Sequence, residues 1–166
     1  MKQINLTLPY HPESFADFTP GTKVLLNGVV YTARDMAHKR ILQLIEDKKE
    51  LPFDLQATAI FHCGPSPARP GAICGAIGPT TSSRMGPYIP ALVDAGLRVI
   101  IGKGNIDQSY QNYMTNHRAI FLVAIGGASA VLSQHVVSCE TFLWSDLGAE
   151  AVYRMELRDF PCYIPL

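Results

Sequence analysis

The hydrophobic and polar positions of the chain fall into short patterns that predict both strands and helices. Positions 3–8 alternate apolar and polar residues, which is typical of a half-buried strand. Positions 23–31 predict a longer strand with a bulge at Asn27-Gly28. Over positions 34–48 the apolar residues recur at every third or fourth position, which predicts an amphipathic helix.

The middle of the chain alternates strand and helix patterns, and further strands gather towards its end. Glycines and prolines punctuate these short segments, and positions 64–72 predict a loop. The further predicted strands are 57–63, 73–77, 97–101, 119–124, 137–143 and 151–158, and the further predicted helices are 83–95, 107–116 and 129–135. This order predicts a single α/β domain over residues 1–166, with more than one sheet layer.

Composition narrows the class of protein. Apolar residues make up 48% of the chain and charged residues 17%, and the formal net charge is zero. This balance argues against a general nucleic-acid binder, while the high apolar fraction favours a buried partner surface. The mainly apolar stretch 119–132 is shorter than the roughly 18 residues that span a bilayer. Because the first residues lack a signal-peptide pattern, we expect a cytoplasmic protein without membrane contact.

The spacing of the cysteines bears on metal binding. Cys63, Cys74, Cys139 and Cys162 match no CxxC metal or redox pattern, so reduced thiols in a cytoplasmic interior are expected. We therefore expect no cluster or zinc site held by this chain alone.

The segment Gly78-Pro79-Thr80-Thr81-Ser82-Ser83-Arg84-Met85 carries the strongest chemical signal. It places four hydroxyl residues and an arginine between a predicted strand and a predicted helix. Free N–H groups at a helix N-terminus attract anions, hydroxyls add donors, and a guanidinium matches a carboxylate with two parallel hydrogen bonds. The alternative is that the hydroxyls only cap the helix, but one hydroxyl would suffice for that.

Two glycine-containing segments follow predicted strands. Lys103 lies between Gly102 and Gly104, at the end of a predicted buried strand, where α/β sheets bind their ligands. A plain turn with a solvent-facing lysine explains this segment equally well, and it lacks the GxxxxGK[ST] spacing of a P-loop. Gly126-Gly127 could seat an anion before the next helix, although close backbone packing explains the pair as well.

Arg34 and His38 share one face of the predicted helix 34–48, at its N-terminal end. Thr32 and Asp35 have the spacing of a capping box at the start of this helix. A cation at the edge of a core face needs an anion, which Asp35 or a partner's carboxylate could supply. For His38 a hydrogen-bonded structural role is the simpler interpretation.

Three strand-to-helix junctions therefore each carry one cation: Arg34, Arg84 and Lys103. The sequence lacks a GxSxG elbow, an HExxH helix, a paired-carboxylate signature and a dinucleotide fingerprint. The junctions are suited to hold a small polyanion, with a di-acid as the leading candidate, but they supply no electrophile.

Taken in order, four segments resemble the signatures of iron–sulfur-dependent hydro-lyases, specifically the β subunit or C-terminal domain of class I fumarase and L-tartrate dehydratase. These segments are Arg34-Asp35-Met36-Ala37-His38, the hydroxyl segment 78–85, Gly102-Lys103-Gly104-Asn105 and Gly126-Gly127. The resemblance covers about residues 22–164. Positions 103–105, 147–151 and 159–161 look closer to the fumarase branch, whereas Ser82-Ser83 stands where many fumarases have smaller residues.

The resemblance implies a fold, a partner and residue roles. The implied fold is a three-layer swivelling β/β/α domain, and a separate α subunit carries a 4Fe–4S cluster on three cysteines. The implied activity is reversible hydration of a dicarboxylate, most closely fumarate and malate, with the cluster as Lewis acid. Thr80 and Lys103 are the implied catalytic residues. The implied substrate-binding residues are Arg34, Arg84, Thr81, Gly126, Gly127 and His38.

Two other functions remain open. The chain could be the β subunit of an L-tartrate dehydratase, or a non-catalytic anion-binding swivelling module that docks on a larger enzyme. The isolated chain could also form a homodimer.

Overall fold

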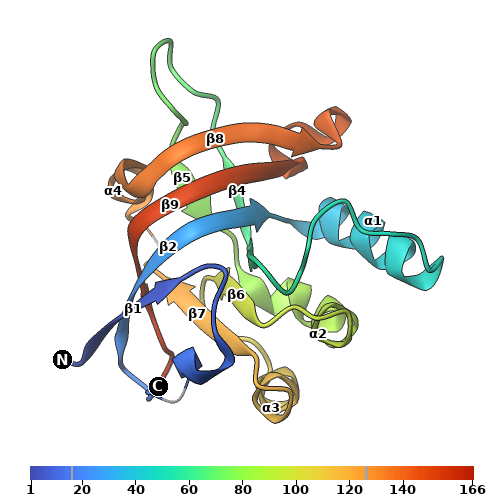
Figure 1. Cartoon of the computed structure of the whole chain (residues 1–166). Coiled ribbons are helices and arrows are strands. Elements are labelled where there is room, and N and C mark those ends of the chain that lie inside the picture. The colour runs from blue at the N-terminus through green and yellow to red at the C-terminus, as the bar shows by residue number, and fades with distance from the viewer. Residues whose placement is uncertain (16, 126) are drawn as a thin grey trace.

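The computed structural model describes residues 1–15, 17–125 and 127–166, and it is built around a twisted mixed sheet (Figure 1). The strand order is β1-β2-β3-β6-β7-β9-β8. The strands are β1 (Gln3–Thr7), β2 (Lys23–Thr32), β3 (Ala59–Phe61), β6 (Val99–Gly102), β7 (Ile120–Ala124), β8 (Val136–Leu143) and β9 (Val152–Tyr163). Neighbours from β1 to β7 pair in parallel, and β9 pairs antiparallel with β7, β2 and β8.

The sheet closes on itself. Because β2 pairs with β3 on one side and with β9 on the other, β2, β3, β6, β7 and β9 form a barrel-like ring. β1 and β8 extend from this ring as additional strands. In Figure 1, β8 and β9 curve side by side over the top of the molecule, and α1, α2 and α3 lie together at the right and below.

Successive residues of the short central strands point into two different cores. Phe61 and Ile101 belong to the cluster that the ring strands share, whereas Ile60 and Ile100 pack in the cluster beneath the helices. All four side chains are fully buried. Burial on both faces explains why β3 and β6 read as continuous apolar runs rather than as alternating patterns.

Helices and 3₁₀ segments connect the strands, and a second small sheet pairs β4 (Cys63–Pro65) with β5 (Ile77–Pro79). The helices are α1 (Asp35–Glu46), α2 (Ile89–Asp94), α3 (Gln108–Asn116) and α4 (Ser129–Leu132). The 3₁₀ segments are η1 (Pro12–Phe15), η2 (Ser82–Tyr88), η3 (Ser133–His135) and η4 (Ser145–Glu150). In the described part of the chain, none of these helices has the length and apolar character that a bilayer crossing requires.

The α/β class is confirmed. The strand predicted over 3–8 is β1, and the helix predicted over 34–48 is α1. The predicted bulge at Asn27-Gly28 appears as a shift in the β2–β9 register between Leu26 and Gly28. The predicted three-layer β/β/α arrangement is not shown by this structure, because the main sheet closes into a ring rather than forming separate layers. It stays a prediction.

Two predictions in proline-rich segments are wrong. The strand predicted over 73–77 is displaced, because β5 begins only at Ile77 and its partner β4 lies partly inside the predicted loop. The helix predicted over 83–95 is a 3₁₀ segment followed by a short α-helix. Pro87 lies inside η2, where it removes a backbone donor, and Pro90 lies in the first turn of α2, where no donor is needed.

The predicted capping box is also wrong. Arg34 occupies the N-cap position of α1, and no side chain caps that end of the helix. Thr32 is instead the buried last residue of β2. Its Oγ1 accepts a hydrogen bond from the Tyr153 N–H at 2.9 Å and lies 3.4 Å from the Ala151 carbonyl oxygen, so the hydroxyl joins β2 to β9.

Candidate functional site at the strand ends

The carboxyl ends of the parallel strands lie in register. Thr32 of β2 is paired with Phe61 of β3, and Phe61 is paired with Ile101 of β6. Arg34 lies two residues after Thr32, and Lys103 lies two residues after Ile101. Since neighbouring strands lie about 4.8 Å apart, the backbones of Thr32 and Ile101 are separated by about 10 Å, with the end of β3 between them.

The hydroxyl segment lies across this edge. The Thr80 N–H donates to the His62 carbonyl at 2.7 Å, at the end of β3. Thr81 forms an isolated parallel bridge with Lys103, and the Ser82 N–H donates to the Lys103 carbonyl at 3.0 Å. The backbone of Thr80, Thr81 and Ser82 is therefore held against the strand ends that carry the predicted cations.

Arg84 reaches the N-terminal end of α1. Its Nε and Nη2 each lie 3.3 Å from a carboxylate oxygen of Asp35, in a paired arrangement. The hydrogen bond from Arg84 lowers the pKa of Asp35. Because Asp35 directly follows Arg34, this ion pair brings η2 and α1 together, and both predicted arginines lie at one edge.

Arg34 is held by a close backbone approach. A Cβ on Gly64 would lie 2.6 Å from the Ala149 carbonyl oxygen and 2.9 Å from Cδ of Arg34, so the arginine side chain lies along a residue that has to be glycine. Its Nε is 3.9 Å from Oε1 of Glu150. This Nε is buried and has no hydrogen-bond partner among the described residues. The guanidinium therefore retains donor capacity.

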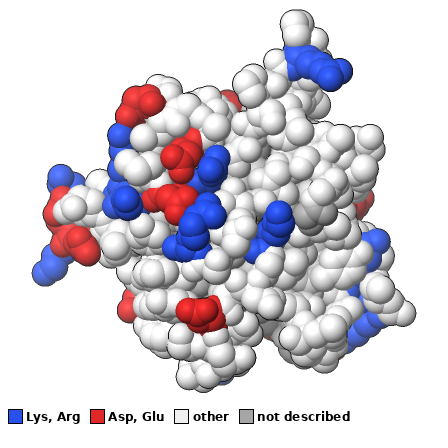
Figure 2. Space-filling view, turned by 180° about the vertical axis from the view of Figure 1, so that it is seen from behind, with Lys and Arg blue, Asp and Glu red and all other residues white. Residues whose placement is uncertain are grey.

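The charges at this edge do not cancel. Asp35 and Glu150 face the two arginines, whereas Lys103 is exposed and makes no ion pair in the part of the chain that the structure describes. Three cations against two carboxylates leave one positive charge for an anion. Figure 2 shows basic and acidic side chains interspersed on the face that it draws, which differs from the uniformly basic face of a nucleic-acid binder.

Two histidines lie beneath the edge. His38 and His62 are 1% and 0% exposed, and their ring centroids are 5.1 Å apart. Burial lowers the pKa of His38 to about 4 and holds the pKa of His62 well below its usual value, so both rings are neutral near pH 7. His38 bonds through Nδ1 to the Arg34 carbonyl at 2.8 Å. This placement puts His38 behind Arg34 rather than on the surface.

The glycine pair is only partly described. Gly127 has a φ of +79°, and a Cβ built there would meet no atom within 4 Å, so open space lies beside it. A Cβ on Gly78 would lie 3.6 Å from Oγ of Ser129, which brings the start of α4 next to β5 and the hydroxyl segment. Gly126, a predicted binding residue, lies outside the described residues.

Sequence reasoning missed two residues of this edge, Glu150 and His62, and one contact. It offered Asp35 as an anion for Arg34, whereas the carboxylate pairs with Arg84, because that contact depends on how η2 packs against α1. Glu150 approaches Arg34 only through the fold. His62 lies in an apolar stretch of the sequence. A polar side chain there was the one available signal for a buried hydrogen-bonded contact, since a buried imidazole requires partners.

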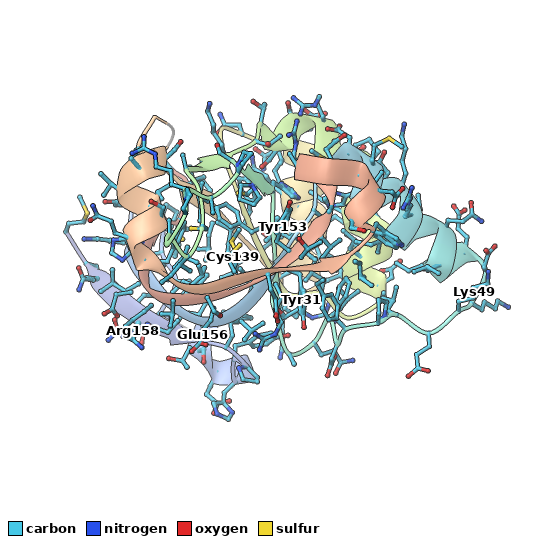
Figure 3. The ribbon with its side chains drawn as sticks, turned by 90° about the horizontal axis from the view of Figure 1, so that it is seen from above. Tyr31, Lys49, Cys139, Tyr153, Glu156 and Arg158 are labelled. Carbon is cyan, nitrogen blue, oxygen red and sulfur yellow. The ribbon has the colours of Figure 1, made fainter. Side chains whose placement is uncertain are left out.

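The cysteines are not grouped as ligands of one metal site in the described part of the chain. All four are free thiols; Cys63 and Cys162 are buried, and burial raises the pKa of Cys139 to about 11. Figure 3 shows Cys139 on the same side of the β8–β9 ribbon as Tyr153, whereas Glu156 and Arg158 point to the other side. Over residues 1–15, 17–125 and 127–166, no three His, Cys, Asp or Glu residues are grouped so that they could hold a metal ion.

The fold and the edge together define the class: an α/β domain with a barrel-like mixed sheet whose parallel strand ends carry cations and hydroxyls. A family model described as the C-terminus of fumarase matches residues 1–166. The chain belongs to this family, the hydro-lyase family of fumarate hydratases and L(+)-tartrate dehydratase β subunits.

The similar proteins fall into two groups. Fumarate hydratase class I, anaerobic, of Escherichia coli (strain K12) is 34% identical over 166 residues, which cover 99% of this chain and 29% of that protein. Fumarate hydratase 2 of Leishmania major is 32% identical over 154 residues, which cover 92% of this chain and 27% of that protein. The L(+)-tartrate dehydratase subunit beta of Escherichia coli (strain K12) is 29% identical over 164 residues, which cover 96% of this chain and 80% of that protein.

The chain spans less than a third of the length of the fumarate hydratases that it matches, but four fifths of the tartrate dehydratase subunit. The identities to the two groups are close to one another. The similarity therefore identifies the family rather than the substrate.

Proposed function

We propose that this chain is the substrate-binding half of an iron–sulfur-dependent hydro-lyase that reversibly hydrates a dicarboxylate. The leading substrate pair is fumarate and malate. The observation that carries the proposal is the in-register edge, where Arg34, Arg84 and Lys103 lie around the Thr80–Thr81 backbone.

In this proposal the cations bind the two carboxylates of the substrate. A guanidinium presents two parallel N–H donors to a carboxylate, and the unused Nε of Arg34 supports such a role. Lys103 contributes a point charge at the other side of the edge. Thr81 and Gly127 line the approach, and His38 supports the backbone of Arg34 from behind.

Thr80 is proposed for proton transfer at the reacting carbon. A threonine hydroxyl is a poor base in water, so the role requires a site in which neighbouring cations stabilise its charged form. The same cations favour substrate binding, and the backbone bridge between Thr81 and Lys103 brings Lys103 next to the residue that follows Thr80.

The 4Fe–4S cluster is proposed to belong to a separate α subunit, since the cysteines in the described part of this chain are not grouped as ligands of one metal site. When bound in its own subunit, such a cluster supplies a Lewis acid for the departing hydroxyl. The match to 80% of a protein named as a β subunit supports a separate partner chain. The swivelling β/β/α architecture and the cytoplasmic location belong to the same proposal.

Reconstitution tests this function. The chain is combined with a cluster-loaded α subunit, and turnover of fumarate, malate and tartrate is followed, with fumarate absorbance as the signal for the first two. Turnover of fumarate and malate supports the leading assignment, and turnover of tartrate alone supports an L-tartrate dehydratase β subunit. A fully assembled complex that turns over none of the three overturns the enzyme assignment and favours the non-catalytic docking module.

A further inference from the structure

The hydroxyl of Ser82 is buried and has two polar neighbours. The Lys103 backbone N–H donates to Ser82 Oγ at 3.1 Å, and His62 Nδ1 lies 2.8 Å from the same oxygen. Ser82 and His62 are both 0% exposed. A Cβ on Gly102 would collide with Ser82 Oγ, so glycine at that position allows the hydroxyl to reach this place.

The donors and acceptors at Ser82 determine the tautomer of His62. A hydroxyl has one proton to donate, and Lys103 already uses one of its acceptor positions. The other neighbour within reach is His62 Nδ1. If Nδ1 carried a proton, the Ser82 proton would be buried without an acceptor, which is unfavourable. Ser82 therefore donates to a bare Nδ1, and His62 carries its proton on Nε2.

The tautomer of His38 follows from the same reasoning. Its Nδ1 lies 2.8 Å from the Arg34 carbonyl oxygen, which can only accept. His38 therefore donates from Nδ1 and has a bare Nε2. Tyr88 stacks on the ring, with centroids 5.2 Å apart, and holds its orientation.

The two remaining nitrogens are complementary. Nε2 of His62 is a donor and Nε2 of His38 is an acceptor, and both are buried without a hydrogen-bond partner among the described residues. The rings lie edge to face at 67°. A small ring movement or one buried water molecule would join them, as buried polar groups require.

We propose that Ser82, His62 and His38 form one buried hydrogen-bond relay that runs from the Lys103 backbone to the Arg34 backbone and fixes the spacing of these two cations. The three side chains are positioning residues, since they act on substrate only through Lys103 and Arg34. The proposal rests on the proposed function for its kinetic consequence, but the relay itself is a property of this chain. The lowered pKa values of both histidines agree with it, because a relay with these tautomers requires neutral rings.

The tautomers are tested directly by nitrogen NMR of the full chain with ¹⁵N-labelled histidine, since protonated and bare ring nitrogens have well-separated shifts. We expect a proton on Nε2 of His62 and on Nδ1 of His38 at pH 7. In the Ser82→Ala variant we expect the His62 signals to change, whereas Ser109→Ala, at an exposed position of α3, should leave them unchanged. A proton on Nδ1 of His62, or a charged ring on either residue, overturns the relay.

The kinetic consequence is tested in the reconstituted complex. Ser82→Ala is expected to lower kcat/KM for the dicarboxylate by about ten- to a hundredfold, because small misplacements of binding groups are costly. His62→Asn keeps an acceptor near the Nδ1 position and is expected to retain more activity than His62→Phe. Ser109→Ala serves as the matched control and should match the wild type.

The possible failures are distinguishable. If the wild-type complex shows no turnover while the NMR signals have the expected tautomers, the proposed function is wrong and the relay stands. If the wild type turns over and Ser82→Ala matches it, the positioning role is wrong, whatever the substrate. Equal activity of His62→Asn and His62→Phe also contradicts it.

Discussion

The two ends of the parallel strands differ in kind. At the amino end of β7, Phe15, Phe18, Met114 and Ile164 line a hollow of about 610 Å³, in which Arg118 is the charged residue. The carboxyl ends carry Arg34 and Lys103, the backbone of the hydroxyl segment and two buried imidazoles. By contrast, the hollow at the amino end is lined mainly by apolar side chains.

This difference in donors and charges is why we place the proposed site at the carboxyl ends rather than in the hollow. Ligands of open α/β sheets collect at the carboxyl ends of strands, where the chain leaves the sheet and helices begin. At that end, the buried Nε of Arg34 has no hydrogen-bond partner among the described residues. The backbone of Lys103 bonds to the Ser82 hydroxyl and forms a bridge with Thr81. A packed apolar core would not need these polar groups. We expect the two ends to differ in their effects on activity and on stability as well.

The largest effect is expected from removing a cation at the carboxyl end. Lys103→Ala and Arg84→Ala should each lower kcat/KM of the reconstituted complex by at least about a hundredfold, because each removes a charge-assisted contact to substrate. The measurement is the initial rate of fumarate formation or loss. Size-exclusion chromatography checks that each variant still assembles with its partner.

The matched control lies at the other end. Arg118→Gln removes a cation from the rim of the hollow and should leave kcat/KM within about twofold of the wild type. A large loss of kcat/KM in Arg118→Gln would mean that the hollow, rather than the carboxyl end, contributes to activity. If the Lys103 and Arg84 variants lost assembly rather than turnover, the result would favour a docking module.

The placement of the three predicted cations at one edge could be predicted from the sequence because the signals for it are local. Arg34, Arg84 and Lys103 each stand where a strand pattern gives way to a helix pattern. Parallel strands then bring their carboxyl ends to one edge without further information. The structure accordingly brings Arg34, Arg84 and Lys103 to one edge, whereas Gly126 lies outside the described residues.

The remaining parts depend on long-range pairing that local patterns do not contain. Closure of the ring needs β9 to pair with both β2 and β7, and these strands are far apart in the chain. That closure also takes the hydroxyl of Thr32 away from the predicted capping box. The contact between His62 and Ser82 likewise depends on the β4–β5 sheet, which proline-rich sequence obscures.

The second-largest expected effect is a loss of stability at low pH, caused by the two buried histidines at the carboxyl end. The folded pKa values of His38 and His62 lie below 6.5, so between about pH 6.5 and 4 the unfolded chain binds protons that the folded chain does not. The free energy of unfolding should therefore fall as pH falls, by up to about 1.4 kcal/mol per pH unit for each histidine. Above about pH 6.5 these two groups contribute no slope.

Denaturant titrations between pH 7 and 4.5 measure this slope. His62→Asn should remove about half of the histidine contribution, and hydrogen exchange should show α1 and β3 losing protection before α3. An unchanged slope in His62→Asn would mean that the acid sensitivity arises elsewhere in the molecule.

A smaller effect separates two paired glycines of the β4–β5 sheet. Gly64 and Gly78 face one another in register, but only a Cβ on Gly64 would collide with backbone and with Arg34. Gly64→Ala should lower the free energy of unfolding by about 1–3 kcal/mol, as overpacking does, and should displace Arg34. Gly78→Ala should change it by less than about 0.5 kcal/mol, since its Cβ meets ordinary van der Waals distances. Equal losses in the two variants would mean that Arg34 is not held by Gly64.

The smallest effect concerns the pair between Asp35 and Arg84. Both side chains are partly exposed, so solvent screens their attraction, and a double-mutant cycle with Asp35→Asn and Arg84→Gln should give a coupling of about 0.2–1 kcal/mol. Chemical denaturation at low and high salt measures it, and the coupling should shrink at high salt. The cycle of Asp35→Asn with Arg118→Gln provides the control, because these residues lie at opposite ends of the strands and should not couple. A coupling well above 1 kcal/mol would mean that Arg84 serves mainly to anchor α1, which would weaken its assignment as a ligand for substrate.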